Sequence, residues 1–268
     1  MPDLTEKPDP SDRSGPGPKG QKPRSELHLV QLLPNLITLA AMCAGLTGIR
    51  FAIGGQFQAA VALILVAAVL DGLDGRIARL LKSESEIGAE LDSLVDFVNF
   101  GVAPGLTMYM WGLHELQAGG WIATLLYASC CLLRLARFNI GNRVSPSADK
   151  VATPGFTGVP SPGGAILAML PAYVAFMAPG AELHPALLAV YLVVVGGLMI
   201  SRFPTPSFKS ITFQADHVLY VIIAFVALVA AILSYPWETM VTISLGYVLV
   251  LTYALWQARK PRKPAARP

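Results

Sequence analysis

The order of apolar and polar positions divides the chain into long apolar segments separated by short polar or turn-forming stretches. A helix that spans a membrane needs about 20 mostly apolar residues. Eight segments meet this requirement, at residues 33–53, 57–81, 92–112, 120–140, 160–178, 184–202, 216–234 and 238–257. We therefore expect an all-α integral membrane protein, a bundle of about eight transmembrane helices.

Residues that favour turns stand between the apolar segments, and we expect the helices to break there. The fifth segment is the least regular, because two prolines, Pro162 and Pro171, interrupt it. The predicted breaks between segments are Gly54-Gly55, Gly119-Gly120, Pro179-Gly180, the pair Pro204 and Pro206, and Tyr235-Pro236.

The composition argues against a soluble enzyme. Only 14% of the residues are charged, whereas a soluble domain carries about 25%. Residues 1–26 are rich in Pro, Gly and charge, and we expect them to form a disordered tail. Residues 259–268 form a basic tail that either lies against anionic headgroups or is the positive flank of the last helix. Residues 27–258 form the predicted transmembrane domain.

The basic residues predict the orientation of the bundle, because Lys and Arg collect on the cytoplasmic side of membrane proteins. With a cytoplasmic N-terminus, 19 of the 20 Lys and Arg residues fall on the inner side, and Arg50 is the exception. This division fits an even number of spans. We therefore expect a multi-pass protein of the inner (plasma) membrane with both tails in the cytoplasm.

One stretch of the predicted transmembrane domain is strongly charged. Ten of the 22 charged residues between positions 27 and 258 lie from Asp71 to Asp96. An ionisable side chain inside a membrane helix costs several kcal/mol, so it normally faces a cavity or a partner. Helical periodicity predicts two facing stripes. One contains Asp71, Gly75, Ala78 and Lys82, flanked by Asp74 and Arg79, and the other contains Ser85, Gly88, Asp92, Asp96 and Asn99.

Four aspartates that converge in a membrane helix pair need positive charge to offset their repulsion. Oxygen-only ligands favour Mg²⁺, Mn²⁺ or Ca²⁺, and two such ions would balance four carboxylates. Gly75, Ala78 and Gly88 either pack helices together or leave room for a ligand, and Arg79 offers donors for phosphate oxygens. The pattern favours phosphoryl transfer at the membrane surface. The alternative, a cation-coupled transporter, predicts acids near the bilayer midplane on discontinuous helices.

The spacing of these residues resembles the signature of the CDP-alcohol phosphatidyltransferases at every defining position. The matching pattern is Asp71-x-x-Asp74-Gly75-x-x-Ala78-Arg79 followed by Gly88-x-x-x-Asp92-x-x-x-Asp96. In that family an alcohol hydroxyl group attacks a CDP-linked lipid and displaces CMP. The resemblance covers roughly residues 30–215. Further segments resemble the bacterial and archaeal phosphatidylserine synthases of the family, at residues 33–38, 93–104, 134–139, 158–162 and 206–209.

The resemblance implies a helical bundle of the family's type and a set of ligands. The substrates would be CDP-diacylglycerol and L-serine, and the products CMP and phosphatidylserine. Asp71, Asp74 and Asp92 would bind one divalent cation, and Asp71, Asp92 and Asp96 a second. Mg²⁺ or Mn²⁺ is expected, with Ca²⁺ as a non-native occupant. Asp96 would be the general base. The resemblance also implies a homodimer among membrane lipids, with no nucleic acid as partner.

The same resemblance assigns two groups of substrate contacts. The CDP-lipid would contact Asn35, Thr38, Gly75, Ala78, Arg79, Ser85 and Gly88. Serine would contact Asn99, Arg134, Arg137 and Asn139. Three points stay open: the two arginines also suit a positive-inside anchor or a lipid phosphate, Asn99 also suits helix packing, and Pro160-Ser161-Pro162 suits a backbone break better than chemistry. Glycerol 3-phosphate or inositol phosphate is the alternative acceptor, and either would favour a further basic pocket.

Overall fold

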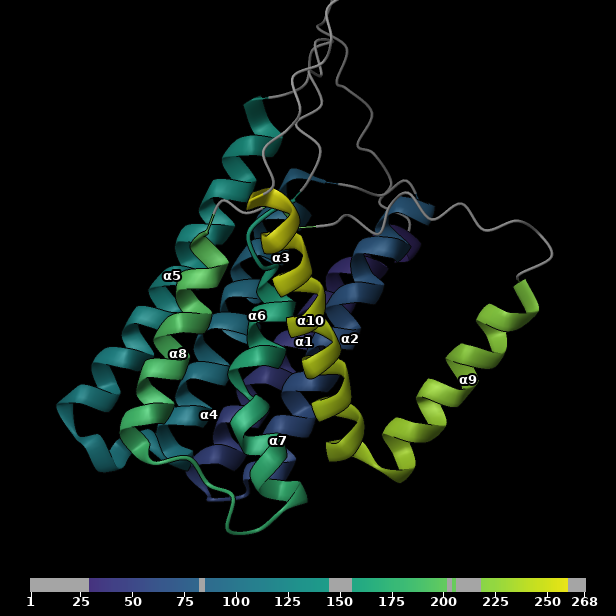
Figure 1. Cartoon of the computed structure of the whole chain (residues 1–268). Coiled ribbons are helices and arrows are strands. Elements are labelled where there is room, and N and C mark those ends of the chain that lie inside the picture. Colours follow the sequence, from purple (N-terminus) through teal and green to yellow (C-terminus); the bar gives the residue numbers. More distant parts are fainter. Residues whose placement is uncertain (1–28, 82–84, 145–155, 202–203, 206–217, 260–268) are drawn as a thin grey trace, which may run out of the picture.

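The computed structural model describes residues 29–81, 85–144, 156–201, 204–205 and 218–259, which form a bundle of helices (Figure 1). Helices α1 (Leu29–Ile53) and α2 (Phe57–Leu81) each have 25 residues. At 1.5 Å per residue each is about 37 Å long, enough to cross the hydrocarbon core of a bilayer. They form an antiparallel pair whose tight turn contains Gly55 at φ 75°, which confirms the break predicted at Gly54-Gly55.

The third apolar segment is one continuous helical run of three parts. It passes from α3 (Glu86–Asp96) through a π-helix, η1 (Phe97–Val102), into α4 (Ala103–Trp111). It begins earlier than the predicted residue 92 because Ser85 caps it, its Oγ accepting a hydrogen bond of 3.0 Å from the main-chain N–H of Gly88. The charged first turn of α3 is therefore helical.

The break predicted at Gly119-Gly120 is wrong. Both glycines lie in the first turn of α5 (Ala118–Val144), and the chain turns earlier, through the 3₁₀-helix η2 (Leu113–Leu116) and Gln117 at φ 49°. Gly120 serves close packing. A Cβ atom at this position would clash with the main-chain oxygen of Leu113.

The fifth segment is two short helices, α6 (Ser161–Ala168) and α7 (Leu170–Met177). Pro162 and Pro171 lie in their first turns, where the missing N–H costs no helical hydrogen bond. Helix α8 (Pro185–Ile200) follows a turn in which Gly180 has φ 96°, which confirms the break at Pro179-Gly180. Two-residue antiparallel strands, β1 (Phe156–Thr157) and β2 (Pro204–Thr205), pair beyond the helix ends.

The last two helices are α9 (Val218–Ser234) and α10 (Pro236–Arg259), which meet at the predicted break Tyr235-Pro236. Helix α10 packs against α7, whereas α9 diverges from the bundle and has its main contacts with α10 (Figure 1). The core contains fully buried side chains such as Phe100 and Tyr127. The hydroxyl group of Tyr127 donates a hydrogen bond of 2.8 Å to the main-chain oxygen of Phe100 within η1.

The helices indicate a multi-pass membrane protein. Among the described residues, four helices are long and apolar enough to span a bilayer, within α1, α2, α5 and α10. The remaining apolar helices are shorter or divided, so the count of eight spans stays a prediction. Many large apolar side chains on the outside of the bundle are exposed, as lipid-facing positions require.

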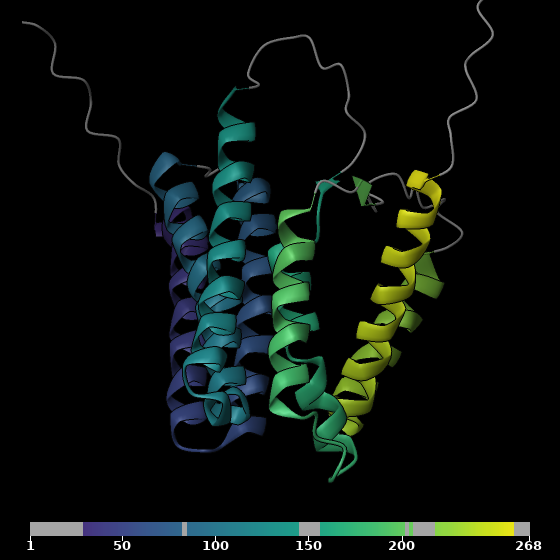
Figure 2. The ribbon, with the colours of Figure 1, turned by 60° about the vertical axis from the view of Figure 1, so that its left-hand side comes forward.

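Helix ends that carry several of the predicted site residues lie at one end of the bundle. This end contains the C-terminal ends of α2 and α5 and the N-terminal ends of α3 and α6, and the turn from α1 to α2 lies at the other (Figure 2). The predicted N-terminal tail, the basic tail after Arg259, and Lys82, Lys150 and Lys209 lie outside the described residues.

Candidate active site

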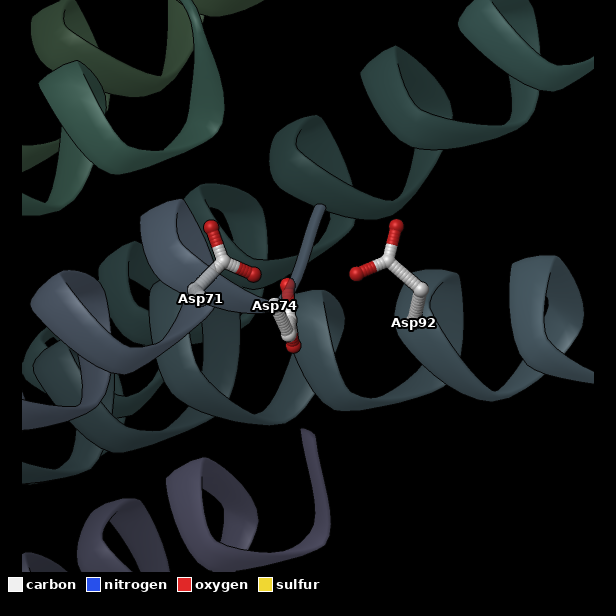
Figure 3. Close-up of side chains that lie close together, drawn as sticks. All are labelled: Asp71, Asp74 and Asp92. Atoms are coloured by element: carbon white, nitrogen blue, oxygen red, sulfur yellow. The ribbon is translucent and has the colours of Figure 1, made fainter. Parts of the chain in front are cut away.

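Three aspartates bring their carboxylate groups together between α2 and α3. Asp71 and Asp74 come from the half of α2 nearest the end described above, and Asp92 comes from α3 (Figure 3). One carboxylate oxygen from each lies within 4.8 Å of the others, so the three could hold a metal ion. The two predicted stripes therefore face each other. Asp96, one turn further along α3, lies outside this compact group but interacts electrostatically with Asp71 and Asp92.

The Asp74 carboxylate is fixed from a third helix, α1. Asp74 is 3% exposed and Thr38 is 4% exposed. The hydroxyl group of Thr38 lies 2.6 Å from Oδ2 of Asp74 and donates a hydrogen bond to it. Oδ1 of Asp74 is also buried and has no hydrogen-bond partner among the described residues. A buried carboxylate oxygen without a donor is unfavourable alone, and a cation would satisfy it. The residues present therefore fit a metal ion.

A cavity of about 230 Å³ opens beside these carboxylates, between α1, α2 and α3. Six of the seven predicted CDP-lipid residues line it, together with Pro34, Ala89 and two of the aspartates. The six are Asn35, Thr38, Gly75, Ala78, Ser85 and Gly88.

The two glycines of the cavity have different effects on its shape. A Cβ atom at Gly75 would meet no atom within 4 Å, so this glycine leaves the wall open. A Cβ atom at Gly88 would lie 2.9 Å from Oδ1 of Asn35 and 3.0 Å from Oγ of Ser85. Gly88 therefore allows these two polar side chains to approach the backbone of α3.

Arg79, the seventh predicted CDP-lipid residue, does not line the cavity. Its Nε donates a hydrogen bond of 2.9 Å to the main-chain oxygen of Gly75, one turn earlier in α2, and its side chain is exposed. This bond engages only Nε, so the N–H groups on Nη1 and Nη2 are the donors that a phosphate group could use.

A second polar group of residues surrounds Arg134 on α5. Nη1 of Arg134 donates a hydrogen bond of 2.5 Å to Oγ of Ser161, the fully buried first residue of α6. Arg134 also interacts electrostatically with Asp96 and with Tyr247 of α10. Neither Ser161 nor Tyr247 was predicted to belong to the site. Ser161 does start a helix between two prolines, as expected of a backbone break, but nothing in its sequence context indicates its contact with Arg134.

The other residues predicted to bind serine lie apart from Arg134 or are already engaged. Nη1 of Arg137 donates a hydrogen bond of 2.8 Å to the main-chain oxygen of Ile200 at the end of α8. Nδ2 of Asn139 donates one of 2.9 Å to Oγ of Ser93 on α3. These two residues join α5 to neighbouring helices.

Asn99 is fully buried in η1 and packs against α1. A Cβ atom at Gly45 of α1 would clash with Oδ1 of Asn99. Both polar atoms of the Asn99 amide group lack a hydrogen-bond partner among the described residues. The π-helix begins at Phe97, so the 3.6-residue periodicity that aligned Asn99 with Asp92 and Asp96 does not apply there.

Comparisons with known proteins place the chain in a family. A family model described as CDP-alcohol phosphatidyltransferase matches residues 31–199. A CDP-diacylglycerol–serine O-phosphatidyltransferase of Mycobacterium leprae is 38% identical over 250 residues, which cover 90% of this chain and 81% of that protein. Proteins of the same name from Helicobacter pylori and Bacillus subtilis are 33% and 32% identical, over 74% and 66% of this chain and 81% and 91% of theirs.

The matched residues extend from α1 to α8 and so contain the four aspartates, the cavity and Arg134. Helices α9 and α10 follow the segment that the family model matches. On the length of this match and the identity to these relatives, the chain belongs to the CDP-alcohol phosphatidyltransferase family.

Proposed function

We propose that the protein transfers the phosphatidyl group of CDP-diacylglycerol to the hydroxyl group of L-serine, releasing CMP and forming phosphatidylserine. The observation that carries this proposal is that Asp96 interacts electrostatically both with Asp71 and Asp92 of the aspartate cluster and with the partly buried Arg134. The aspartate cluster suits a nucleotide diphosphate with its cations, and Arg134 suits an acceptor that carries a carboxylate group. The names of the relatives support the choice of serine.

Members of the family use divalent cations, and the aspartate cluster has the oxygen donors that such ions prefer. We assign Asp71, Asp74 and Asp92 to one ion and Asp71, Asp92 and Asp96 to a second, with Mg²⁺ or Mn²⁺ as the ion. When bound, the ions polarise phosphoryl oxygens and offset the charge that develops on them. Thr38 orients the Asp74 carboxylate for this role through its hydrogen bond.

Asp96 is the proposed general base. It takes the proton of the serine hydroxyl group while that oxygen forms a bond to the phosphorus that carries diacylglycerol. The bond from this phosphorus to the CMP oxygen breaks, and CMP leaves with the electron pair. Oδ1 of Asp96 is buried and has no hydrogen-bond partner among the described residues, so it is free to receive the proton. Arg134 binds the carboxylate group of serine beside it.

The cavity between α1, α2 and α3 is the proposed nucleotide site. Gly75 and Ala78 leave room for the nucleotide, and Asn35, Ser85 and the main chain at Gly88 supply polar contacts. Arg79 turns toward the cavity and donates to a phosphate oxygen through Nη1 and Nη2. Six of the seven residues predicted to contact the CDP-lipid thus keep that role in the proposal, and Thr38 acts through Asp74.

We also propose that the site and both termini face the cytoplasm of a cell whose inner (plasma) membrane holds the protein. The positive-inside rule supports this orientation, because Arg76, Arg79, Arg134 and Arg137 belong to the same end of the bundle and Arg50 to the other. A homodimer completes the proposal, on the strength of the family resemblance. Cross-linking in native membranes is the direct test of the dimer.

The test of the activity is CMP release by the purified full-length protein in lipid nanodiscs. The assay contains CDP-diacylglycerol, Mn²⁺ or Mg²⁺, and L-serine, glycerol 3-phosphate or inositol phosphate, with the lipid product identified by mass spectrometry. Of the three acceptors, we expect only L-serine to give a lipid product, and we expect no product after EDTA chelates the metal. Turnover with a phosphorylated acceptor but not with serine would refute the choice of acceptor. Cation transport without CMP release would favour the transporter.

A further inference from the structure

Helix α10 carries one tyrosine into the group of residues around Arg134. The ring of Tyr247 lies against the first turn of α6, where Gly163 follows Ser161 by two residues. A Cβ atom at Gly163 would lie 3.2 Å from Cε1 and Oη of Tyr247 and 3.3 Å from Cζ. These distances are too short for an ordinary contact, so a side chain at position 163 would push the phenol away. Gly163 allows the phenol to reach the beginning of α6.

The hydroxyl group of Tyr247 is buried and has no hydrogen-bond partner among the described residues. A buried polar group left unpaired is unfavourable, and native structures normally supply a partner from protein, water or ligand. Oδ1 of Asp96 is also buried and has no hydrogen-bond partner among the described residues. Both side chains interact electrostatically with Arg134. Two side chains with an unpaired polar atom therefore interact with one partly buried cation.

Arg134 has donors to spare. A guanidinium group has five N–H bonds, and Ser161 accepts from Nη1. A carboxylate group has about four acceptor positions and commonly takes two parallel bonds from arginine. A neutral phenol can donate to a third position without adding charge. An α-amino acid held in this way by its carboxylate group would keep its side-chain hydroxyl free for Asp96.

We infer that Tyr247 is a specificity-determining residue of the acceptor site, whose hydroxyl group donates a hydrogen bond to the carboxylate group of the amino acid bound at Arg134. The inference rests on the proposed function and adds to it a residue from α10, beyond the segment that the family model matches. It assigns to the C-terminal helix part of the choice between amino acids and acceptors that lack a carboxylate group.

The experiment compares Tyr247→Phe with the unaltered full-length protein in nanodiscs. We expect the KM for L-serine to rise about 10–100-fold, the usual effect of losing one hydrogen bond to a charged group. The kcat and the KM for CDP-diacylglycerol should stay within about twofold, because the hydroxyl contributes to acceptor binding alone. The matched control is Tyr235→Phe, the same change at an exposed tyrosine before α10, and it should leave all three constants unaltered.

A second variant tests the position of the phenol. Gly163→Ala removes no polar group but places a methyl group against the ring of Tyr247. It should raise the KM for L-serine in the unaltered background and add little to Tyr247→Phe, because both changes remove the same contact.

The outcomes separate this inference from the function on which it rests. Absence of serine turnover by the unaltered protein would overturn both. Normal serine turnover with an unaltered serine KM in Tyr247→Phe would overturn the inference alone. Parallel changes in the KM values of both substrates, together with a lower melting temperature, would show that Tyr247 has a structural role and would also overturn it.

Discussion

The nucleotide side and the acceptor side of the site are built in different ways. The residues around the cavity lie between positions 34 and 92 on three consecutive helices. The residues around Arg134 come from α3, α5, α6 and α10, and Asp96 and Tyr247 are far apart in the sequence. A site on neighbouring helices constrains the local spacing of residues, whereas a site assembled from distant helices constrains single positions. This difference explains why the first side has a recognisable motif.

The two sides also differ in their electrostatics. Three carboxylates converge on the nucleotide side, which therefore requires added positive charge. The acceptor side has a partly buried arginine and suits a ligand with negative charge. Asp96 interacts with residues of both sides. Variants that affect one side and spare the other can show whether the two sides act separately.

The largest effect is expected for Asp96→Asn, which keeps the shape of the side chain but removes the base. The kcat for CMP release in the presence of serine should fall about 10²–10⁴-fold, while binding of CDP-diacylglycerol is partly retained. Initial rates and a separate binding titration measure the two effects. A matched control is Glu115→Gln at the opposite end of the bundle. Near-normal transfer would refute the role of Asp96, and loss of CDP-lipid binding would show that the two sides are inseparable.

A smaller effect is expected for Thr38→Val on the nucleotide side. The change removes the hydrogen bond to Asp74 with little change in shape, so affinity for Mg²⁺ or Mn²⁺ should fall about 10–100-fold. Titration of activity with metal at saturating substrates measures this, and the KM for serine at saturating metal should not change. Thr47→Val is the control, because Thr47 is also on α1 but bonds to the main-chain oxygen of Cys43. Equal effects of the two variants would contradict the role of Thr38.

The smallest effect is expected for Gly75→Ala, paired with Gly72→Ala one turn away on α2. A Cβ atom at either position would meet no atom within 4 Å, but Gly75 lines the cavity. Both changes should stabilise the helix, by up to about 1 kcal/mol. Gly75→Ala should also raise the KM for CDP-diacylglycerol about five- to tenfold, since the new methyl group crowds the ligand. If Gly72→Ala raised this KM equally, the nucleotide would not occupy the cavity as proposed.

Much of the nucleotide side could be predicted from the sequence. Helical periodicity placed Asp71 opposite Asp92, and apolar segments gave the helical runs, because both depend on residues close together in the chain. The proposed roles of these residues stay untested predictions.

What the sequence could not predict depends on packing between distant residues. Gly120 was expected to break the chain, but it lies where α5 approaches η2. Ser161 was expected to be only part of a backbone break, and Tyr247 was not singled out, because their positions beside Arg134 depend on how α6 and α10 pack. Helix propensity and the spacing of residues along the chain contain no information about such contacts between distant helices.

The π-helix between Phe97 and Val102 lets α3 and α4, the two halves of one continuous helical run, turn different faces toward their neighbours. An extra residue in a helical turn rotates everything after it by about 100° relative to everything before it. Asp92 can therefore point at α2 while Gly105 packs against Thr124 of α5. A descendant of this protein that lost one residue from the π-helix would have to sacrifice one of these two alignments. Insertions and deletions should consequently be rarer here than the apolar character of the segment suggests.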